Sequence, residues 1–366
     1  MVYRSWAEIN LSNLEKNLKN IYEFSKKHIF AVVKADAYGH GAVKIAKFLE
    51  NFKQVRYLCV ATAEEGKELK EAGIKKPVLV LGGMLEEEID IFNEYNLIPV
   101  ISDFYHLKLI KKLRTKKIHI KFDTGMNRLG FYKKDIPEIV KYLSNIDVEG
   151  IMSHFPSADL DQNYTREQIK EFFLIKEKLK MMLKTKFKYI HIQNTAGTIY
   201  KCDFCNSIRI GIGLYGTKPF ENFPVELKQV MTVKAKVISI KEIKKGSKIS
   251  YTGSFTADRD MKVAVVSFGY ADGLPRSLSN KGYFLIKGKK AKIVGNITMD
   301  MTIVDISDIS NINIGDEVII LGEQITFDKV SKIANTIPYE IMCSISKRVF
   351  RKTIREKNET VINTCN

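Results

Sequence analysis

The chain has 366 residues, enough for one large barrel with an added domain or for two ordinary domains. Its 45% hydrophobic and 28% charged residues are typical of a globular protein with a substantial core. No apolar run approaches the roughly 18 residues of a membrane span, and the first residues lack the apolar segment of a signal peptide, so we expect a cytoplasmic protein without membrane contact.

A formal net charge of +17 raises the alternative of a basic nucleic-acid-binding protein. The lysines are spread along the chain, as at Lys178, Lys180 and Lys184, and no helix-turn-helix, RRM or zinc-finger pattern accompanies them. We therefore expect no nucleic-acid partner. The five cysteines are scattered, and Cys202 and Cys205 lack the second pair that a zinc site needs, so we expect reduced thiols and no metal.

Over the first 220 residues, short apolar runs alternate with amphipathic helical segments. Capping-box patterns at Ser12 and Thr62 predict two helix starts, and residues 168–184 predict a long helix. Strand–helix alternation is typical of a parallel sheet with helical crossovers, and eight repeats predict a closed (β/α)8 TIM-type barrel. The expected strands are residues 30–33, 58–60, 78–81, 98–101, 118–122, 148–152, 189–192 and 207–210.

The pattern changes after Leu227. Apolar β-type segments then follow one another with glycine and lysine at the turns, at residues 233–240, 263–266, 283–286, 293–294, 302–304 and 318–321. Helical periodicity returns only near residues 327–334. We therefore predict a barrel domain over residues 1–227 and a mostly β C-terminal domain over residues 228–366.

Residues capable of chemistry follow five of the eight expected barrel strands. They are Lys34 and Tyr38 after the first strand, Lys121 and Arg128 at the fifth, His154 at the sixth, Asn194 and Thr195 after the seventh, and Arg209, Gly211 and Ile212 at the eighth. Each alone could be a surface charge, a core residue or a simple turn. Because active sites of such barrels lie at the carboxyl ends of the strands, together they predict one site at the barrel mouth.

These residue types suit a pyridoxal-phosphate site. A lysine desolvated at a barrel mouth can lose its proton and form a Schiff base with an aldehyde cofactor. The Gly211 loop and the Thr195 hydroxyl can donate to a phosphate, and Arg209 would lie near the ring nitrogen of the cofactor. That combination is what pyridoxal phosphate requires of a protein.

At these residues, and over nearly its whole length, the sequence resembles the alanine racemases. The resemblance is carried by AVVKADAYGHG at 31–41, KFDTGMNRLGF at 121–131, SHFPSAD at 153–159, RIGIGLYG at 209–216, ISYTG at 249–253, GYADGLPR at 269–276, VGNITMD at 294–300 and TIPYEI at 336–341. It implies a fold-type III barrel with a C-terminal β domain, a head-to-tail homodimer, and interconversion of L- and D-alanine that supplies peptidoglycan synthesis.

The resemblance also implies a role for individual residues. Lys34 would hold the cofactor and act as one catalytic base, with Tyr251 as the other. Contacts to pyridoxal 5′-phosphate would come from Lys34, Tyr38, His154, Asn194, Thr195, Arg209, Gly211, Ile212 and Tyr339. Substrate contacts would come from Arg128, Tyr270, Met299 and Asp300, and Lys121 would be carbamylated by CO2. Tyr251, Tyr270 and Met299 would act on the cofactor of the partner subunit.

Two bases on opposite faces of a planar intermediate suit racemisation, because the Cα proton must leave one face and return to the other. Arg209 would donate a hydrogen bond to the ring nitrogen without giving up a proton, which makes the ring a poorer electron sink and limits transamination. The alternatives are a broad-spectrum amino-acid racemase of the same fold and a non-catalytic pyridoxal-phosphate carrier. Asn127, Pro156, Asn296 and Thr298 depart from the commonest family pattern without removing a catalytic group.

Overall fold

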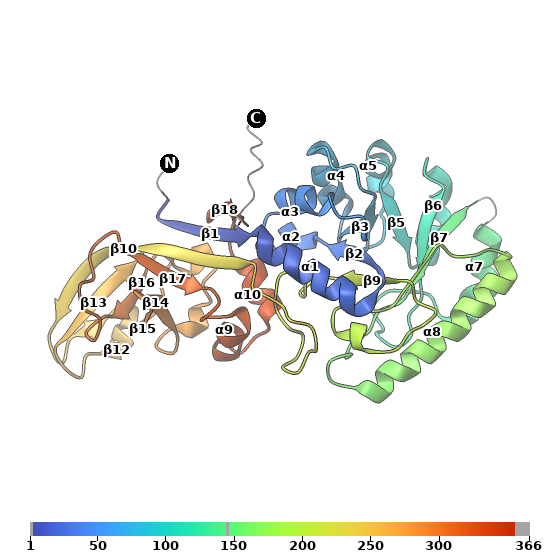
Figure 1. Cartoon of the computed structure of the whole chain (residues 1–366). Helices are drawn as coiled ribbons and strands as arrows, with labels where there is room; N and C mark the ends of the chain where they lie inside the picture. Colours follow the sequence, from blue (N-terminus) through green and yellow to red (C-terminus); the bar gives the residue numbers. More distant parts are fainter. Residues whose placement is uncertain (1–2, 144–145, 356–366) are drawn as a thin grey trace, which may run out of the picture.

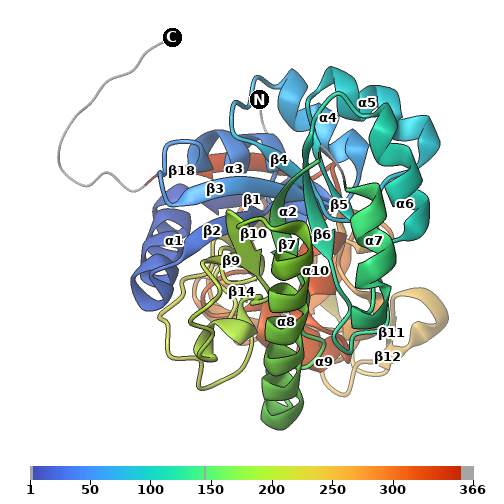
Figure 2. The same cartoon turned by 90° about the vertical axis from the view of Figure 1, so that its right-hand side faces the viewer.

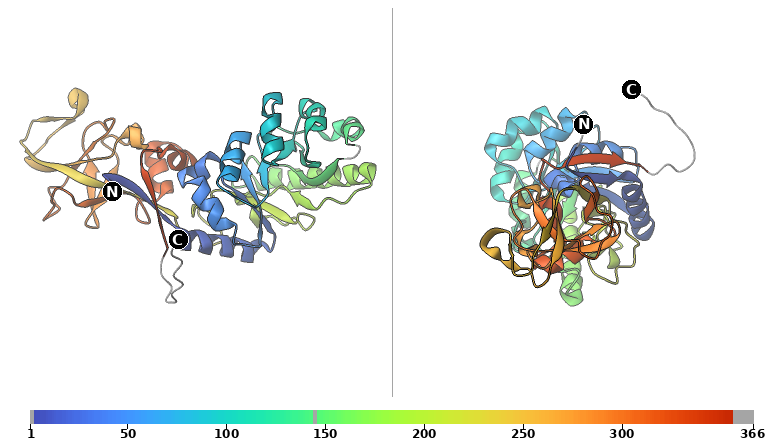
Figure 3. Two further views of the ribbon diagram at one scale, coloured as in Figure 1. Left: turned by 90° about the horizontal axis from the view of Figure 1, so that it is seen from above. Right: turned by 90° about the vertical axis from the view of Figure 1, so that its left-hand side faces the viewer.

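The structure, a computed structural model, describes residues 3–143 and 146–355. These residues form two lobes that lie side by side along the long axis of the molecule (Figure 1). Seen from above, one lobe contains most of the first two thirds of the chain and the other is built mainly from its last third (Figure 3). The N-terminal segment runs from the second lobe into the first.

The first lobe is a barrel of eight parallel strands, as predicted. Strands β2 to β8 pair in chain order, and β9 pairs with β2. Backbone hydrogen bonds from Asn206 N to Ile190 O (3.1 Å) and from Arg209 N to Gln193 O (3.0 Å) close the barrel between β8 and β9. The strands are β2 (His28–Val32), β3 (Val55–Val60), β4 (Val78–Val80), β5 (Ile98–Ile101), β6 (Lys117–Lys121), β7 (Asp147–Met152), β8 (Tyr189–His191) and β9 (Ser207–Ile210).

Helices cover the outside of the barrel (Figure 2). Besides α2 (Lys34–Gly39), they are α1 (Leu11–Ser25), α3 (Ala42–Leu49), α4 (Ala63–Glu71), α5 (Ile89–Glu94), α6 (Phe104–Leu109), α7 (Ile136–Tyr142) and α8 (Gln162–Leu183). The predicted cap at Thr62 is confirmed, since its side chain accepts a hydrogen bond from Glu65 N. The prediction at Ser12 is wrong: Asn10 caps α1 by accepting from Asn13 N.

Helix α8 also begins earlier than residue 168, because Asp161 accepts a hydrogen bond from Tyr164 N (2.9 Å) and so caps the helix at its first turn.

The second lobe is a mostly antiparallel sheet, which confirms the predicted β-rich fold. Strand β13 pairs with both β16 and β10, so six of its strands close on themselves. The strands are β10 (Met231–Ile243), β13 (Met261–Val266), β14 (Tyr283–Ile286), β15 (Lys289–Ile293), β16 (Thr302–Asp305), β17 (Glu317–Leu321) and β18 (Phe350–Ile354), with a separate ribbon of β11 (Lys248–Ile249) and β12 (Phe255–Thr256). Helices α9 (Phe327–Ala334) and α10 (Pro338–Ser344) lie between this sheet and the barrel (Figure 1).

Strand β1 (Ser5–Asn10) differs from the expectation that residues 1–227 form the barrel domain. It pairs antiparallel with β10 and parallel with β18, and therefore lies in the second sheet. Its side chains Ala7 and Ile9 are buried in the common core. The first strand thus joins the two lobes before the barrel begins.

The turn before β9 holds a disulfide between Cys202 and Cys205, whose Cα atoms are 5.4 Å apart. This corrects the expectation of reduced thiols for that pair, because a tight turn brings two cysteines at this spacing into bonding range. Cys59 and Cys343 are free. None of the helices in the described ranges has the length and apolar character that crossing a bilayer requires.

Candidate active site at the barrel mouth

Lys34 lies directly after β2, at the start of α2 and at the carboxyl end of the barrel strands. The next four residues, Ala35 to Tyr38, have φ values of 52° to 55°, so α2 is a left-handed turn. Such a conformation costs an L-residue roughly 1–2 kcal/mol. Strain of this kind persists only where the surroundings fix it, and it concentrates at functional sites.

Three polar contacts fix the left-handed turn. Glu65 Oε1 accepts a hydrogen bond from Ala35 N (2.7 Å), and Asp36 Oδ1 accepts one from the first backbone N–H of α3 (2.7 Å). Arg351 Nε donates to Gly39 O (3.0 Å). An added Cβ at Gly39 would lie 2.3 Å from a carbonyl oxygen of α10, so α10 packs closely against the turn. The position of Lys34 is therefore set from both lobes.

Tyr38 ends the turn and contacts the loop after β9. An added Cβ at Gly211 would lie 2.3 Å from Tyr38 Oη, so glycine is what lets the phenol approach this backbone. The ring of Tyr339, on α10, lies 6.0 Å from the ring of Tyr38. Burial raises the pKa of Tyr38 and, with Asp159, raises the pKa of Tyr339 to about 12. Both phenols are therefore hydrogen-bond donors at neutral pH.

The loops after β8 and β9 form the rest of this corner. Thr195 Oγ1 accepts a hydrogen bond from Gly213 N (3.4 Å), and Asn194 Oδ1 accepts one from Gly197 N (2.8 Å). Ile212 O accepts from the backbone N–H three residues later (3.1 Å). A carbonyl that accepts a hydrogen bond from a backbone N–H a few residues later is typical of the first turn of a helix. The first N–H groups of such a turn have no partner within it and can bind an anion. The residues predicted to bind phosphate thus lie in adjoining loops.

Arg209 is buried inside the barrel, with 3% of its surface exposed. Its Nη1 donates to His191 Nδ1 (2.7 Å) and His191 O (3.0 Å). Its Nη2 donates to Ser153 O (2.6 Å), His154 Nδ1 (2.9 Å) and Ile192 O (3.2 Å). Burial lowers the pKa of Arg209 to about 10, so the guanidinium is charged at neutral pH. These hydrogen bonds engage both terminal nitrogens, and Nε is the remaining donor of the guanidinium that could serve a ligand.

His154 lies among four cations. Burial, followed by the charges of Arg209, Lys121, Arg128 and Lys34, lowers the pKa of His154 well below its ordinary value. Because the neutral ring accepts from Arg209 at Nδ1, its proton lies on Nε2. These four side chains are thus close enough to His154 for their charges to lower its pKa. A mouth with this charge attracts anions.

Lys121, at the end of β6, is buried, and burial followed by Arg209 and Arg128 lowers its pKa to about 8. It is therefore deprotonated more readily than an ordinary lysine. Arg128 lies in the next loop, where Asp123 Oδ2 accepts a hydrogen bond from Arg128 N (3.1 Å). Asn127 has a φ of 55°, a conformation that asparagine tolerates and glycine favours, which explains how asparagine replaces the commoner glycine here.

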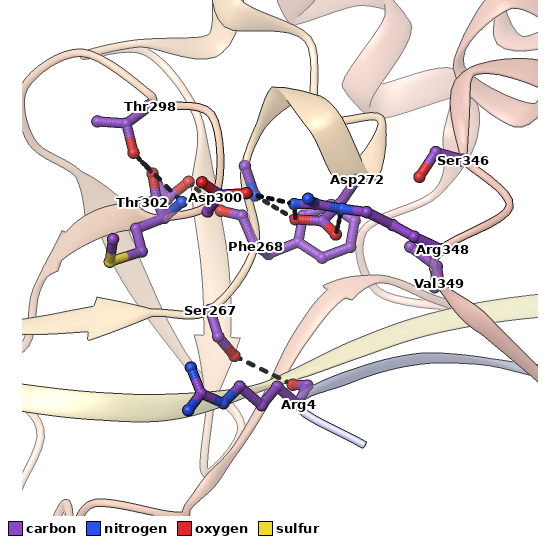
Figure 4. Close-up of polar contacts among 12 residues, drawn as sticks. Arg4, Ser267, Phe268, Asp272, Thr298, Asp300, Thr302, Ser346, Arg348 and Val349 are labelled. Carbon is purple, nitrogen blue, oxygen red and sulfur yellow. Dashed lines mark hydrogen bonds and ion pairs between the residues drawn. The ribbon is translucent and has the colours of Figure 1, made fainter.

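Three of the remaining candidates, Tyr270, Met299 and Asp300, belong to the second lobe, and Figure 4 shows Asp300 beside Arg348 and Asp272. The residue after Tyr270 donates its backbone N–H to Met299 O (3.0 Å), which joins the two segments. Arg348 donates to Asp272 Oδ1 (2.7 Å) and Oδ2 (2.9 Å) and to Asp300 Oδ1 (2.8 Å). Tyr270, Met299 and Asp300 are all exposed, so this surface is open in a single chain.

Tyr251 lies in a strained loop between β11 and β12, where Ser250 and Thr252 have φ values of 65° and 61°. Its side chain is 72% exposed. Asn296 Nδ2 donates to Tyr251 O (3.0 Å), so the asparagine that departs from the commoner arginine supports this loop. Within one chain the β11–β12 ribbon lies in the lobe away from the barrel (Figures 1 and 2). The site residues therefore form two groups, one at the barrel mouth and one on the second lobe.

Several residues of the site are absent from the sequence predictions. Glu65 appears in the sequence only as part of a helix cap, yet it also binds the backbone next to Lys34. Arg348 carries no motif at all. His191 had a visible signal: it lies next to the end of the expected strand 189–192, two residues before the polar Gln193. An inward-facing histidine at that level of the barrel could have been inferred.

The barrel mouth fits a phosphorylated pyridine aldehyde. Lys34 supplies an amine, Tyr38 with the Gly211 loop supplies donors for a phosphate, and Arg209 Nε supplies a donor for a ring nitrogen. The close approach of Tyr38 to Gly211 leaves no room for a larger side chain at that corner. Charge, donors and shape therefore agree with pyridoxal phosphate.

Comparison with known proteins agrees with this geometry. Residues 9–219 match the family described as alanine racemase, N-terminal domain, and residues 230–353 match alanine racemase, C-terminal domain. The chain is 44% identical over 351 residues to the alanine racemase of Aquifex aeolicus, covering 96% of this chain and 99% of that protein. The alanine racemase of Borreliella burgdorferi is 40% identical, with 94% and 95% coverage.

Solved structures show the same likeness. The alanine racemase of Clostridium difficile 630 superposes with a TM-score of 0.91 at 36% identity, over 99% of this chain and 98% of that one. The enzyme of Bartonella henselae, solved with covalently bound pyridoxal phosphate, gives a TM-score of 0.88 at 32% identity, over 96% and 100%. That of Bacillus anthracis, solved with bound L-Ala-P, gives 0.89 at 32% identity, over 100% and 98%. This chain belongs to the alanine racemase family.

Proposed function

We propose that the chain interconverts L- and D-alanine with pyridoxal 5′-phosphate as its cofactor. The observation that carries this proposal is the barrel mouth, where Lys34 immediately precedes a strained turn and four cations surround His154. The named relatives favour alanine over the alternatives of a broad-spectrum racemase and a non-catalytic carrier.

When bound, pyridoxal phosphate supplies an electron-withdrawing ring that stabilises negative charge on the substrate Cα. Lys34 would hold it through Nζ. Tyr38, Asn194, Thr195, Gly211, Ile212 and Tyr339 would hold the phosphate, and His154 would lie beside the ring. Arg209 would donate from Nε to the ring nitrogen while both terminal nitrogens stay bonded to protein acceptors.

Lys34 and Tyr251 would move the proton, one on each face of the substrate. Lys34 would take the Cα proton of D-alanine and Tyr251 that of L-alanine, and the other residue would return a proton to the opposite face. A phenol is largely protonated at neutral pH, so Tyr251 needs a partner that stabilises its anion. His154 can be that partner, because Arg209 directs its N–H to Nε2.

Arg128 would bind the substrate carboxylate, with Lys121 beside it as a carbamate. The lowered pKa of Lys121 supports this, because CO2 adds to the neutral amine and releases one proton. The product is an anion that pairs with a guanidinium, whereas an unmodified ammonium would repel it. Tyr270, Met299 and Asp300 would line the entrance and restrict the size of the substrate side chain.

A homodimer would bring the two groups of residues together. Tyr251, Tyr270 and Met299 are exposed on the second lobe of a chain whose own barrel mouth lies in the other lobe. Head-to-tail pairing of two chains would place each second lobe against the partner's barrel. The same proposal includes a cytoplasmic location and a supply of D-alanine for the cell wall.

The experiment that tests the function is racemisation of L-alanine by the purified chain with added pyridoxal phosphate, followed by circular dichroism. We expect activity, and we expect Lys34→Ala to reduce it to background. Lys47→Ala, an exposed lysine on α3, is the control and should behave like the wild type. Equal rates on alanine, lysine and arginine would instead favour the broad-spectrum alternative, and no racemisation by a cofactor-loaded chain would reject the proposal.

A further inference from the structure

A line of polar side chains runs through the barrel from Arg209 toward its other end. Arg209 Nη1 lies 2.7 Å from His191 Nδ1, and His191 Nε2 lies 2.9 Å from His119 Nδ1. His119 Nε2 then lies 3.9 Å from Glu149 Oε2. All four side chains are buried, with at most 4% exposed. Barrel interiors are ordinarily filled by branched apolar residues, so a buried polar line requires an explanation.

The neighbouring residues make room for this line. An added Cβ at Gly150 would lie 2.3 Å from His119 Nδ1, so the glycine on β7 admits the imidazole. The Phe30 ring packs against both imidazoles, at 5.8 Å from His119 and 4.7 Å from His191. Burial is the largest influence on both histidines and lowers the pKa of each, so both rings are neutral at neutral pH. Each ring therefore has one donor and one acceptor nitrogen.

The ends of the line determine which nitrogen carries each proton. Arg209 can only donate, so His191 Nδ1 must accept and its proton lies on Nε2. His191 then donates to His119 Nδ1, which places the proton of His119 on Nε2, toward Glu149. Within the described ranges His119 Nε2 has no hydrogen-bond partner, although it is fully buried. Glu149 is the acceptor nearest to it along the line.

Glu149 is held as an anion at the far end. Burial opposes this, but the nearby imidazole of His119 and hydrogen bonds from Tyr57 and Lys188 lower the pKa of Glu149 to about 2. The Tyr57 hydroxyl donates to Oε2, and Lys188 Nζ donates to Oε1 (2.9 Å). The Lys188 side chain is 60% exposed, so the line ends at the surface. A donor-only group and an acceptor-only group thus bracket two neutral histidines.

We infer that Glu149 is a positioning residue for the proposed racemase site. Through His119 and His191 it gives the hydrogen bonds one direction, and this keeps the terminal nitrogens of Arg209 engaged while Nε stays available to the cofactor ring. The inference rests on the proposed function. It predicts that Glu149, which lies toward the other end of the barrel from Lys34, affects catalysis without contacting substrate or cofactor.

The test is Glu149→Gln, whose amide can donate where the carboxylate could only accept. His119 could then accept at Nε2, which would reverse the line and set an N–H of His191 against Arg209. We therefore expect mixed tautomers of His119 and His191 in ¹⁵N spectra of the full chain without cofactor, against Nε2–H alone in the wild type. The six histidines of the chain make assignment by single substitution practical. In the holoenzyme, kcat should fall about tenfold, which is the smaller of the losses seen when outer hydrogen-bond partners of metal ligands are removed, while KM stays within about twofold.

Asp147→Asn is the matched control, because Asp147 is an exposed carboxylate on the same strand. It should leave the tautomers and kcat unchanged, and Glu149→Asp should retain the single tautomer. Unchanged tautomers and kcat in Glu149→Gln would overturn the inference. If Glu149→Gln does not fold, His119→Gln is the second variant, because it interrupts the line while Tyr57 and Lys188 still bind Glu149. An unchanged His191 tautomer and an unchanged kcat in His119→Gln would also overturn the inference. Failure of wild-type racemisation would instead reject the proposed function, since the spectra do not depend on activity.

Discussion

Replacing Gly211 with alanine should weaken cofactor binding and leave the fold intact. The added Cβ would lie 2.3 Å from Tyr38 Oη and 2.9 Å from Tyr38 Cζ, so the phenol or the loop must move. Gly211 is not among the glycines with positive φ, so alanine meets no backbone strain there. Overpacking of this kind costs about 1–3 kcal/mol, which corresponds to a loss of about 5- to 150-fold in affinity if it falls on the bound state.

The assay is equilibrium dialysis of pyridoxal phosphate against the apo chain, with thermal unfolding measured in parallel. Gly322→Ala, in the second lobe, is the control, since its nearest contact would be a methyl group at 3.2 Å. Tyr38→Ala added to Gly211→Ala makes space, so the double variant should lose less affinity than the two single losses combined. Wild-type affinity in Gly211→Ala would refute the idea that Tyr38 and this loop together form the phosphate site.

Three further predictions concern individual side chains. Activity should fall when CO2 is removed and recover with bicarbonate, and recovery should be faster at pH 8 than at pH 7 because the neutral fraction of the Lys121 amine rises as the pH passes its pKa of about 8. Lys121→Ala should abolish this dependence on CO2, whereas Lys117→Ala, on the same strand, should keep it. A wild type whose activity does not depend on CO2 would contradict carbamylation. Arg209→Glu should raise transamination of alanine relative to racemisation, measured as pyruvate formed per D-alanine, and an unchanged ratio would show that the guanidinium does not limit this side reaction. Arg348→Gln, which loses its charged contacts to Asp272 and Asp300, should raise KM for alanine more than it lowers kcat; a fall in kcat alone would argue against a role at the entrance.

The sequence predicted the architecture because the relevant signals are local. Alternating apolar runs and helical segments are visible without knowledge of contacts, and the eight runs correspond to β2–β9. Because active sites of such barrels lie at the carboxyl ends of the strands, the sequence also predicted that Lys34, His154 and Arg209 lie at one barrel mouth. Their individual roles remain predictions, and so does the domain boundary at residue 227.

Features that depend on tertiary contacts were not predictable. Residues Ala35 to Tyr38 contain no glycine from which a left-handed turn could be predicted. The turn is instead stabilised by hydrogen bonds of Glu65, Asp36 and Arg351. The pairing of strand β1 with the second sheet was not predictable, because its partners, β10 and β18, lie more than two hundred residues away in the chain. The buried line from Arg209 to Glu149 combines residues from four strands, so no sequence spacing reveals it.

The central claim is that each active site contains Lys34 of one chain and Tyr251 of another. Lys34→Ala and Tyr251→Ala should each be inactive alone. After the two proteins are mixed and their subunits exchange, about one quarter of wild-type activity should appear, since half of the dimers are mixed and one of their two sites has both residues. Subunit exchange confirmed by mass spectrometry without any return of activity would contradict the claim.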